Sequence, residues 1–139
     1  MGRCNLWHPI ETPKRVRFPR CPWALDLSDK TFPGRSKLKP DPNKLGGWYW
    51  ESGVDRDPIE EMEAVRDWNF RAMYGAWDAL KNVDKVHPNH RLNWAAHISG
   101  KRESRRLLGD LVLNKAHLTS KVPFEDGCVI TGWKIDLHL

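Results

Sequence analysis

Charged side chains gather in residues 100–106, which hold four cations and one carboxylate. If this stretch is extended, Arg105 shares a face with Glu103, and Arg106 lies on the other face. Guanidinium groups bind carboxylates and phosphates through paired hydrogen bonds. The spacing is therefore consistent with an anion-binding strand face, and equally with a solvated strand on which the Glu103–Arg105 pair contributes little.

A second candidate for chemistry is His138, which stands two residues after Asp136 in an apolar segment. Alternate residues of a strand share a face, so Asp136 can orient the imidazole as a general acid or base. A structural histidine is the alternative, and it is favoured on these data alone. His87 and His90 form an H-x-x-H pair, but a metal site needs further converging ligands and we expect none.

Glycines and aromatic residues form a third candidate at residues 46–51, which read Gly-Gly-Trp-Tyr-Trp-Glu. Paired glycines permit a close backbone approach, and the rings present flat surfaces for stacking on a sugar or a planar ring. A buried aromatic plug is the alternative that we favour. The chain carries no G-x-G-x-x-G, P-loop, G-x-S-x-G or H-E-x-x-H pattern, so no cofactor cradle or nucleophile elbow is recognisable.

The clearest element that could position these groups is a helix over residues 57–82. Asp57 is a good N-cap, Pro58 suits the first helical position, and the glutamates that follow complement the helix dipole. Apolar residues recur at intervals of three and four from Ile59 to Leu80, so one face should pack against a core. Aromatic side chains on more than one side predict a helix between two layers.

The other elements should be short, which predicts a mixed α+β fold. Residues 91–98 and 103–113 read as strands, Asn114 can cap a short helix over 115–119, and residues 128–131 and 134–139 read as two more strands. The last predicted strand reaches the final residue, for which truncation is the economical explanation. We therefore expect residues 45–139 to be part of a larger domain.

The first 44 residues read as a basic, proline-rich arm. Residues 1–40 hold nine Lys and Arg against three acids, and seven of the ten prolines lie within the first 42 residues. Because each proline removes a donor and fixes φ, we expect residues 9–42 to be extended and weakly ordered. Cations interleaved with Phe18 and Trp23 suit nucleic acid, but a solvated segment that wraps a larger body is the interpretation we favour.

The order of these motifs resembles the middle of FAD-dependent oxidoreductases of the fumarate-reductase-like flavoprotein group. The resemblance covers about residues 45–138 and rests on Gly-Gly-Trp-Tyr-Trp-Glu at 46–51, the helix with Tyr-Gly-Ala-Trp-Asp at 74–78, the arginine motif at 100–113, Phe-Glu-Asp at 124–126 and Gly-Trp-Lys-Ile-Asp-Leu-His at 132–138. It departs at Lys134, where the family usually has proline, and at residues 114–117, where a Thr-Gln-x-Asp-like helix start is usual.

The resemblance implies part of a substrate or cap domain, with FAD held by other segments of the family's chain. The arginines would form the cationic side of a substrate pocket, and Glu103 would hold one of them in place. His138 would be a proton partner near the redox centre, oriented by Asp136. The residues so assigned are, as catalytic, His138, Arg105 and Arg106, and as substrate-binding, Arg102, Glu103, Trp50, Trp133 and Asp136.

The function implied is flavin-linked oxidation or reduction of an anionic or polyhydroxylated small molecule. FAD is the implied cofactor, bound weakly by this chain alone, and the implied partner is a flavin domain. The alternative is a non-catalytic binding module that uses a surface rich in the eight tryptophans for carbohydrate, or the basic arm for nucleic acid. We expect the redox function rather than nucleic-acid binding.

Composition limits the setting in which the chain works. No run approaches the roughly 18 apolar residues of a membrane-spanning helix, and no export signal is legible, which predicts a cytoplasmic protein without membrane contact. The three cysteines, at 4, 21 and 128, form no C-x-x-C pair. This number and spacing disfavour a disulfide framework and a zinc ribbon.

Overall fold

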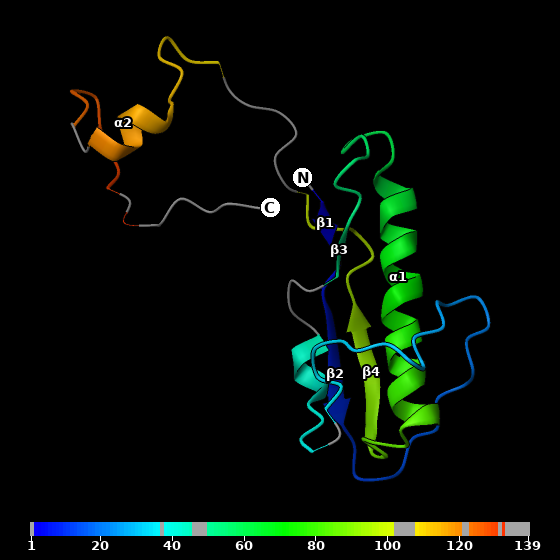
Figure 1. Cartoon of the computed structure of the whole chain (residues 1–139). Coiled ribbons are helices and arrows are strands. Elements are labelled where there is room, and N and C mark those ends of the chain that lie inside the picture. Colours follow the sequence, from blue (N-terminus) through cyan, green and yellow to red (C-terminus); the bar gives the residue numbers. More distant parts are fainter. Residues whose placement is uncertain are drawn as a thin grey trace. The chain divides into compact units, whose positions relative to one another are not determined.

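The computed structural model describes residues 2–36, 38–45, 50–101, 108–120, 123–130 and 132. The chain forms two compact units, residues 1–104 and residues 105–139. The first unit contains one long helix, a short 3-10 helix and two pairs of antiparallel strands (Figure 1). The mixed α+β class that the sequence predicts is confirmed.

The long helix α1 spans Met62–Asp78 and continues into a π-helical segment, η2, at Ala79–Val83. It begins five residues later than predicted, because residues 58–61 form turns instead of regular helix. Asp57 nevertheless caps these turns, since its Oδ1 accepts hydrogen bonds from the N–H groups of Ile59 and Glu60 at 2.7 and 2.8 Å. Asp57 therefore caps the turns that precede α1, and not the first turn of α1 itself.

Two strand pairs place distant parts of the chain side by side. Strand β2, Trp7–Glu11, pairs with β4, His90–Ala95, and strand β1, Arg3–Cys4, pairs with β3, Glu51–Ser52. The β2–β4 register shifts between His8 and Pro9, which is where a proline without an N–H can be accommodated. The predicted strand over 91–98 corresponds to β4.

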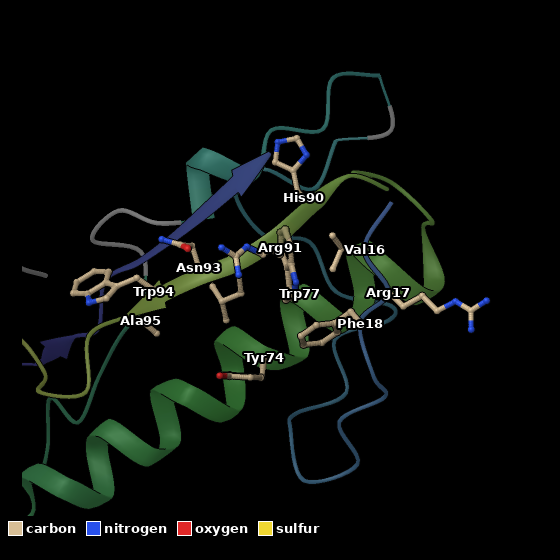
Figure 2. Close-up of a pocket in the computed structure, with 11 residues that line it drawn as sticks. Val16, Arg17, Phe18, Tyr74, Trp77, His90, Arg91, Asn93, Trp94 and Ala95 are labelled. Atoms are coloured by element: carbon tan, nitrogen blue, oxygen red, sulfur yellow. The ribbon is translucent and has the colours of Figure 1, made fainter. Parts of the chain in front are cut away.

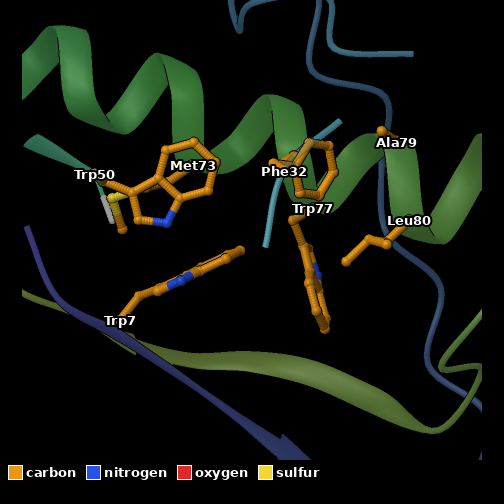
Figure 3. Close-up of a cluster of buried hydrophobic side chains, with 8 residues drawn as sticks. Trp7, Phe32, Trp50, Met73, Trp77, Ala79 and Leu80 are labelled. Carbon is orange, nitrogen blue, oxygen red and sulfur yellow. The ribbon is translucent and has the colours of Figure 1, made fainter. Parts of the chain in front are cut away.

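Residues from the N-terminal segment, from α1 and from η2 share one hydrophobic core (Figure 3). Trp7 lies at its centre, with its ring edge-on to those of Trp77 and Trp50 at centroid distances of 5.6 and 6.5 Å. The other buried members are Phe32, Met73, Ala76, Ala79 and Leu80. The helical apolar periodicity marks the core face from Val65 to Leu80, as predicted, and of the two neighbours Trp68 and Asn69 it is Asn69 that is buried. Ile59, at the start of the predicted pattern, is exposed.

The N-terminal segment has no regular helix or strand over residues 12–36 and 38–41, as expected from its prolines, but it is not weakly ordered, because it packs on the rest of the unit. Phe18 and Leu27 pack against the core, and the N–H of Val16 donates to the carbonyl of Pro88 at 2.9 Å. The segment also crosses α1, where the N–H of Leu25 donates to the carbonyl of Arg71 at 3.0 Å. Prolines exclude helix from this segment, but they leave its side chains free to pack and its remaining N–H groups free to pair.

Gly75 explains how the crossing segment comes so close to α1. A Cβ on Gly75 would clash with the carbonyl oxygen of Leu25 and lie 3.1 Å from its carbonyl carbon. Glycine is unfavourable in mid-helix, by about 1 kcal/mol relative to alanine. Here the missing side chain makes room for the second layer, so the predicted packing of α1 between two layers is confirmed.

The second unit contains the six-residue helix α2, Lys115–Ser120. Its predicted cap is confirmed, because Asn114 Oδ1 accepts hydrogen bonds from the N–H groups of Ala116 and His117 at 2.9 and 3.3 Å. Residues 108–113 and 128–130 form no strand, so those parts of the strand predictions were wrong. Their local strand propensity is not matched by a partner strand among the described residues.

The short 3-10 helix of the first unit, η1, spans Pro42–Leu45. Neither this segment nor any helix in the described parts of the chain combines the length and apolar character needed to cross a bilayer.

Candidate functional site

Of the eight residues assigned from the sequence, the structure describes Trp50. Its side chain is 7% exposed and lies in the core, with ring centroids 6.5 Å from Trp7 and 6.3 Å from Phe32. This is the buried aromatic arrangement that the sequence favoured for its motif, and its role in substrate binding stays a prediction. The other seven, Arg102, Glu103, Arg105, Arg106, Trp133, Asp136 and His138, lie outside the described residues.

A different pocket lies beside β4, where the chain around Phe18 meets the C-terminal half of α1 (Figure 2). Its volume is about 250 Å³. Aromatic rings, cationic groups and one amide line it together. The lining residues are Val16, Arg17, Phe18, Tyr74, Trp77, His90, Arg91, Leu92, Asn93, Trp94 and Ala95.

The aromatic wall of the pocket is held by ring contacts. Phe18 lies edge-on to Trp77 at a centroid distance of 6.4 Å and is tilted against Tyr74 at 6.3 Å. Tyr74 in turn contacts Trp23 at 4.9 Å. Trp77 is fully buried in the core and forms the inner part of this wall, whereas Trp94 is 51% exposed at the pocket's edge.

Polar groups in the same pocket are available to a ligand. Arg17, Arg91 and Asn93 are exposed. The Trp77 Nε1 has no hydrogen-bond partner among the described residues, but it is fully enclosed and does not reach the pocket. Rings for stacking and guanidinium groups for a negative charge suit a small planar or anionic molecule.

A second, more basic cavity of about 250 Å³ adjoins the first, and the two share Val16, Arg17 and Phe18. Its other charged residues are Arg15, Lys81 and Lys85. Lys81 is engaged within the fold, since its Nζ donates to the carbonyl oxygens of His87 and His90, each at 2.8 Å. Burial, and less strongly the charge of Arg15, lower the pKa of Lys81.

Sequence reasoning missed both cavities because each combines segments that are distant in the sequence. The first brings the Val16–Phe18 stretch together with α1 and the whole of β4, and the second brings Arg15–Phe18 together with residues 81–88. The usable signal in the sequence is the interleaving of cations with Phe18, a pattern suited to nucleic acid. Its partners on α1 could not be identified without the fold.

The described residues do not provide a dinucleotide-binding turn. The N-cap of α1 is Glu61, and Glu63 lies in its first turn, so carboxylates stand at the helix start. Asp57 accepts hydrogen bonds from the N–H groups of Ile59 and Glu60 in the turns that precede the helix. A helix start that binds a pyrophosphate instead offers free N–H groups and a positive field. These residues also contain no group of three or more His, Cys, Asp or Glu that could hold a metal ion.

The fold and the pocket thus define a mixed α+β domain that offers an aromatic and cationic pocket, without a cradle for a dinucleotide among its described residues. Comparison with protein-family models matches residues 8–139 to the family described as FAD dependent oxidoreductase. The chain belongs to this family. A search of curated proteins and of solved structures gave no match.

The family match corrects the extent of the resemblance. It begins at residue 8, whereas the motifs suggested a start near residue 45. The first 44 residues are therefore largely inside the family region, which agrees with the packing of Phe18 and Phe32 in or against the common core. Their positive charge belongs to the domain and not to a separate arm.

Proposed function

We propose that this chain supplies the substrate side of a flavin-linked oxidoreductase and that FAD is held by a polypeptide segment outside these 139 residues. The family match over residues 8–139 is the observation that carries the proposal. The sequence has no glycine fingerprint, and carboxylates lie at the start of α1. Both observations support the assignment of FAD binding to another segment.

The substrate in this proposal is an anionic or polyhydroxylated small molecule. Arg102, Arg105 and Arg106 would orient it, Glu103 would hold one of these arginines, and Trp133 would contact it. His138, oriented by Asp136, would exchange a proton with it. The pocket beside β4, with Arg17 and Arg91, is the candidate place among the described residues for a further part of the substrate.

The test is a titration of FAD with the purified 139-residue chain, alone and together with the flavin-binding segment of a family member. The chain alone should leave the flavin absorption band unchanged, and the mixture should perturb the band beyond the effect of the segment alone. Arg91→Met should weaken substrate binding by the mixture, whereas the matched control Arg56→Met should not, because Arg56 is paired with Glu61 away from the pocket. An unperturbed band in the mixture would refute the proposal.

Nucleic-acid binding is the second candidate, and the basic cavity next to aromatic rings is the observation that favours it. Single-stranded nucleic acid is bound by such a combination of cations and stacking rings. Retention on single-stranded DNA that falls steeply with salt, and that Arg15→Ala with Arg17→Ala abolishes, would establish it. Retention that is unchanged in the double variant would exclude these residues.

A further inference from the structure

The basic cavity next to the pocket beside β4 concentrates positive charge. Among the described residues, no carboxylate lines it, and its cations are Arg15, Arg17, Lys81 and Lys85. The segments that form it, residues 15–18 and 81–88, hold one acidic residue, Asp84. Asp84 lies outside the lining, and its Oδ1 pairs with Arg35 Nη2 at 2.8 Å. A cleft lined by charges of one sign attracts ions of the opposite sign.

Hydrogen bonds between the two segments hold the walls of the cavity in place. The N–H of Val16 donates to the carbonyl of Pro88 at 2.9 Å, and Asn82 Nδ2 donates to the carbonyl of Phe18 at 3.3 Å. Lys81 Nζ also donates to the Pro88 carbonyl, at 3.1 Å. The cavity is therefore formed before any ligand arrives, as is usual for small-molecule sites.

The cations of the cavity differ in what they offer a ligand. Lys81 supplies charge but no free donor, because its ammonium group has three N–H groups and donates to three backbone carbonyls of residues 87–90. Burial is the main cause of the lowered pKa of Lys81, and the charge of Arg15 is the second, so these two cations act in the same space. Arg15, Arg17 and Lys85 are exposed and form no ion pair with a carboxylate of the described residues. These three cations are available to an anion.

The stretch that the basic cavity shares with the pocket beside β4 presents different groups to its two sides. Val16, Arg17 and Phe18 line both cavities. Figure 2 shows Phe18 directed toward Trp77 and Tyr74, whereas the Arg17 guanidinium extends the other way. Each cavity, at about 250 Å³, is smaller than the roughly 300 to 1,000 Å³ of a typical small-molecule site, but the two together reach that range. The arrangement suits one ligand with an anionic group on one side and a ring on the other.

We propose that the basic cavity binds the phosphate group of a phosphorylated substrate whose planar part lies in the pocket beside β4. This assignment rests on the proposed function and makes it more specific, since the anionic substrate becomes a phosphate ester. A phosphate monoester carries a charge of about −1.5 to −2 at pH 7 and three strong acceptor oxygens. Arg15, Arg17 and Lys85 match these oxygens in number and charge. A carboxylate has one charge and two oxygens and would leave one cation without a partner.

Isothermal titration calorimetry of the 139-residue chain with phenyl phosphate tests the site, because this probe carries a phosphate group and a ring. Inorganic phosphate, titrated at the same ionic strength, should bind roughly tenfold more weakly, since it lacks the ring that contacts the aromatic wall. Equal affinities would leave free phosphate as the occupant and would overturn the assignment to a substrate. No binding of either probe would overturn the site itself.

Two variants and a matched control localise the binding. Arg15→Met and Lys85→Asn should each weaken phenyl phosphate binding roughly fivefold, which is the effect of one exposed charge pair. Both should keep the wild-type Tm, because neither side chain is ion-paired among the described residues and asparagine tolerates the φ of 56° at Lys85. The control Lys14→Met removes an exposed cation that lies beside Arg15 in the sequence but outside the lining, and it should leave the affinity nearly unchanged. An equal loss in Lys14→Met, or unchanged affinity in both Arg15→Met and Lys85→Asn, would overturn the site.

A second probe separates a small phosphate ester from nucleic acid. Binding of a single-stranded oligonucleotide under conditions where phenyl phosphate does not bind would assign the cavity to nucleic acid and overturn the proposal. The titrations contain no flavin, so their failure leaves the flavin role of the chain standing. Conversely, an unperturbed flavin band in the mixture, together with intact phenyl phosphate binding, would refute the proposed function and leave the phosphate site.

Discussion

Replacing Arg35 by methionine should destabilise the first unit by about 3 kcal/mol, because this side chain fastens the N-terminal segment to the end of the long helix. Its Nε and Nη2 donate to the two carboxylate oxygens of Asp84, both at 2.8 Å. Its Nη1 donates to the carbonyls of Leu27 and Lys30 at 2.6 Å each, and Nη2 also donates to Ser28 at 2.7 Å. The hydrogen bond to Asp84 raises the pKa of Arg35.

The magnitude follows from how enclosed the pair is. The side chains of Arg35 and Asp84 are 15% and 27% exposed, so the pair is more sheltered than a surface ion pair, which contributes about 1 kcal/mol or less. Removing one partner of a fully buried pair costs roughly 3 to 5 kcal/mol. Partial exposure places Arg35→Met near the lower end, and the carbonyls that lose their donors remain accessible to water in the variant.

Urea unfolding followed by tryptophan fluorescence measures this loss, and the midpoint should fall while the slope stays constant. The Tm should fall by about 10 °C. Arg35→Lys should recover less than half, because an ammonium cannot form the paired contact with the carboxylate. A loss below about 0.5 kcal/mol, or full recovery with lysine, would refute the idea that Arg35 fastens the segment.

Three further predictions concern the helix and the loop behind it. Gly75→Ala should lower the free energy of unfolding, measured in urea, by about 1 to 3 kcal/mol. Alanine favours helix, but its Cβ would clash with the Leu25 carbonyl. A stabilised variant would contradict this packing. Asn69→Leu should cost about 2 to 3 kcal/mol in the same assay, since it leaves buried groups without partners, and a neutral effect would show that the network contributes little. Burial, and less strongly His90, lower the pKa of His87 below its ordinary 6.5, so the unfolded chain binds more protons and stability should fall as the pH drops below 6.5. Urea midpoints at neutral and acidic pH should show a smaller drop in His87→Asn, which tolerates the positive φ there, and an equal drop in both proteins would exclude His87.

Local signals predicted the parts of the fold that local physics determines. The cap at Asp57, the apolar face that ends at Leu80 and the cap at Asn114 each depend on residues within a few positions of one another. The wrong strands at 108–113 and 128–130 show the limit of the same signals. Strand propensity describes a side chain's fit to a sheet, and it gives no partner strand.

The prediction that the N-terminal segment is weakly ordered was wrong because contacts with residues distant in the sequence order it. Trp7 pairs with Ala95 across β2 and β4, and Arg35 bonds Asp84, so residues more than 40 positions apart stabilise each other. Seven prolines indicated only the absence of helix. The aromatic and cationic pocket was missed for the same reason, since Phe18 and Tyr74 meet only in the folded chain.

The flavin role of this chain is tested most directly by the absorption spectrum of FAD bound to the flavin-binding segment of a family member, recorded with and without the 139 residues. The chain should shift the flavin band, and the anionic substrate should shift it further only when the chain is present. A band that is identical with and without the chain would contradict its place in a flavin-linked oxidoreductase.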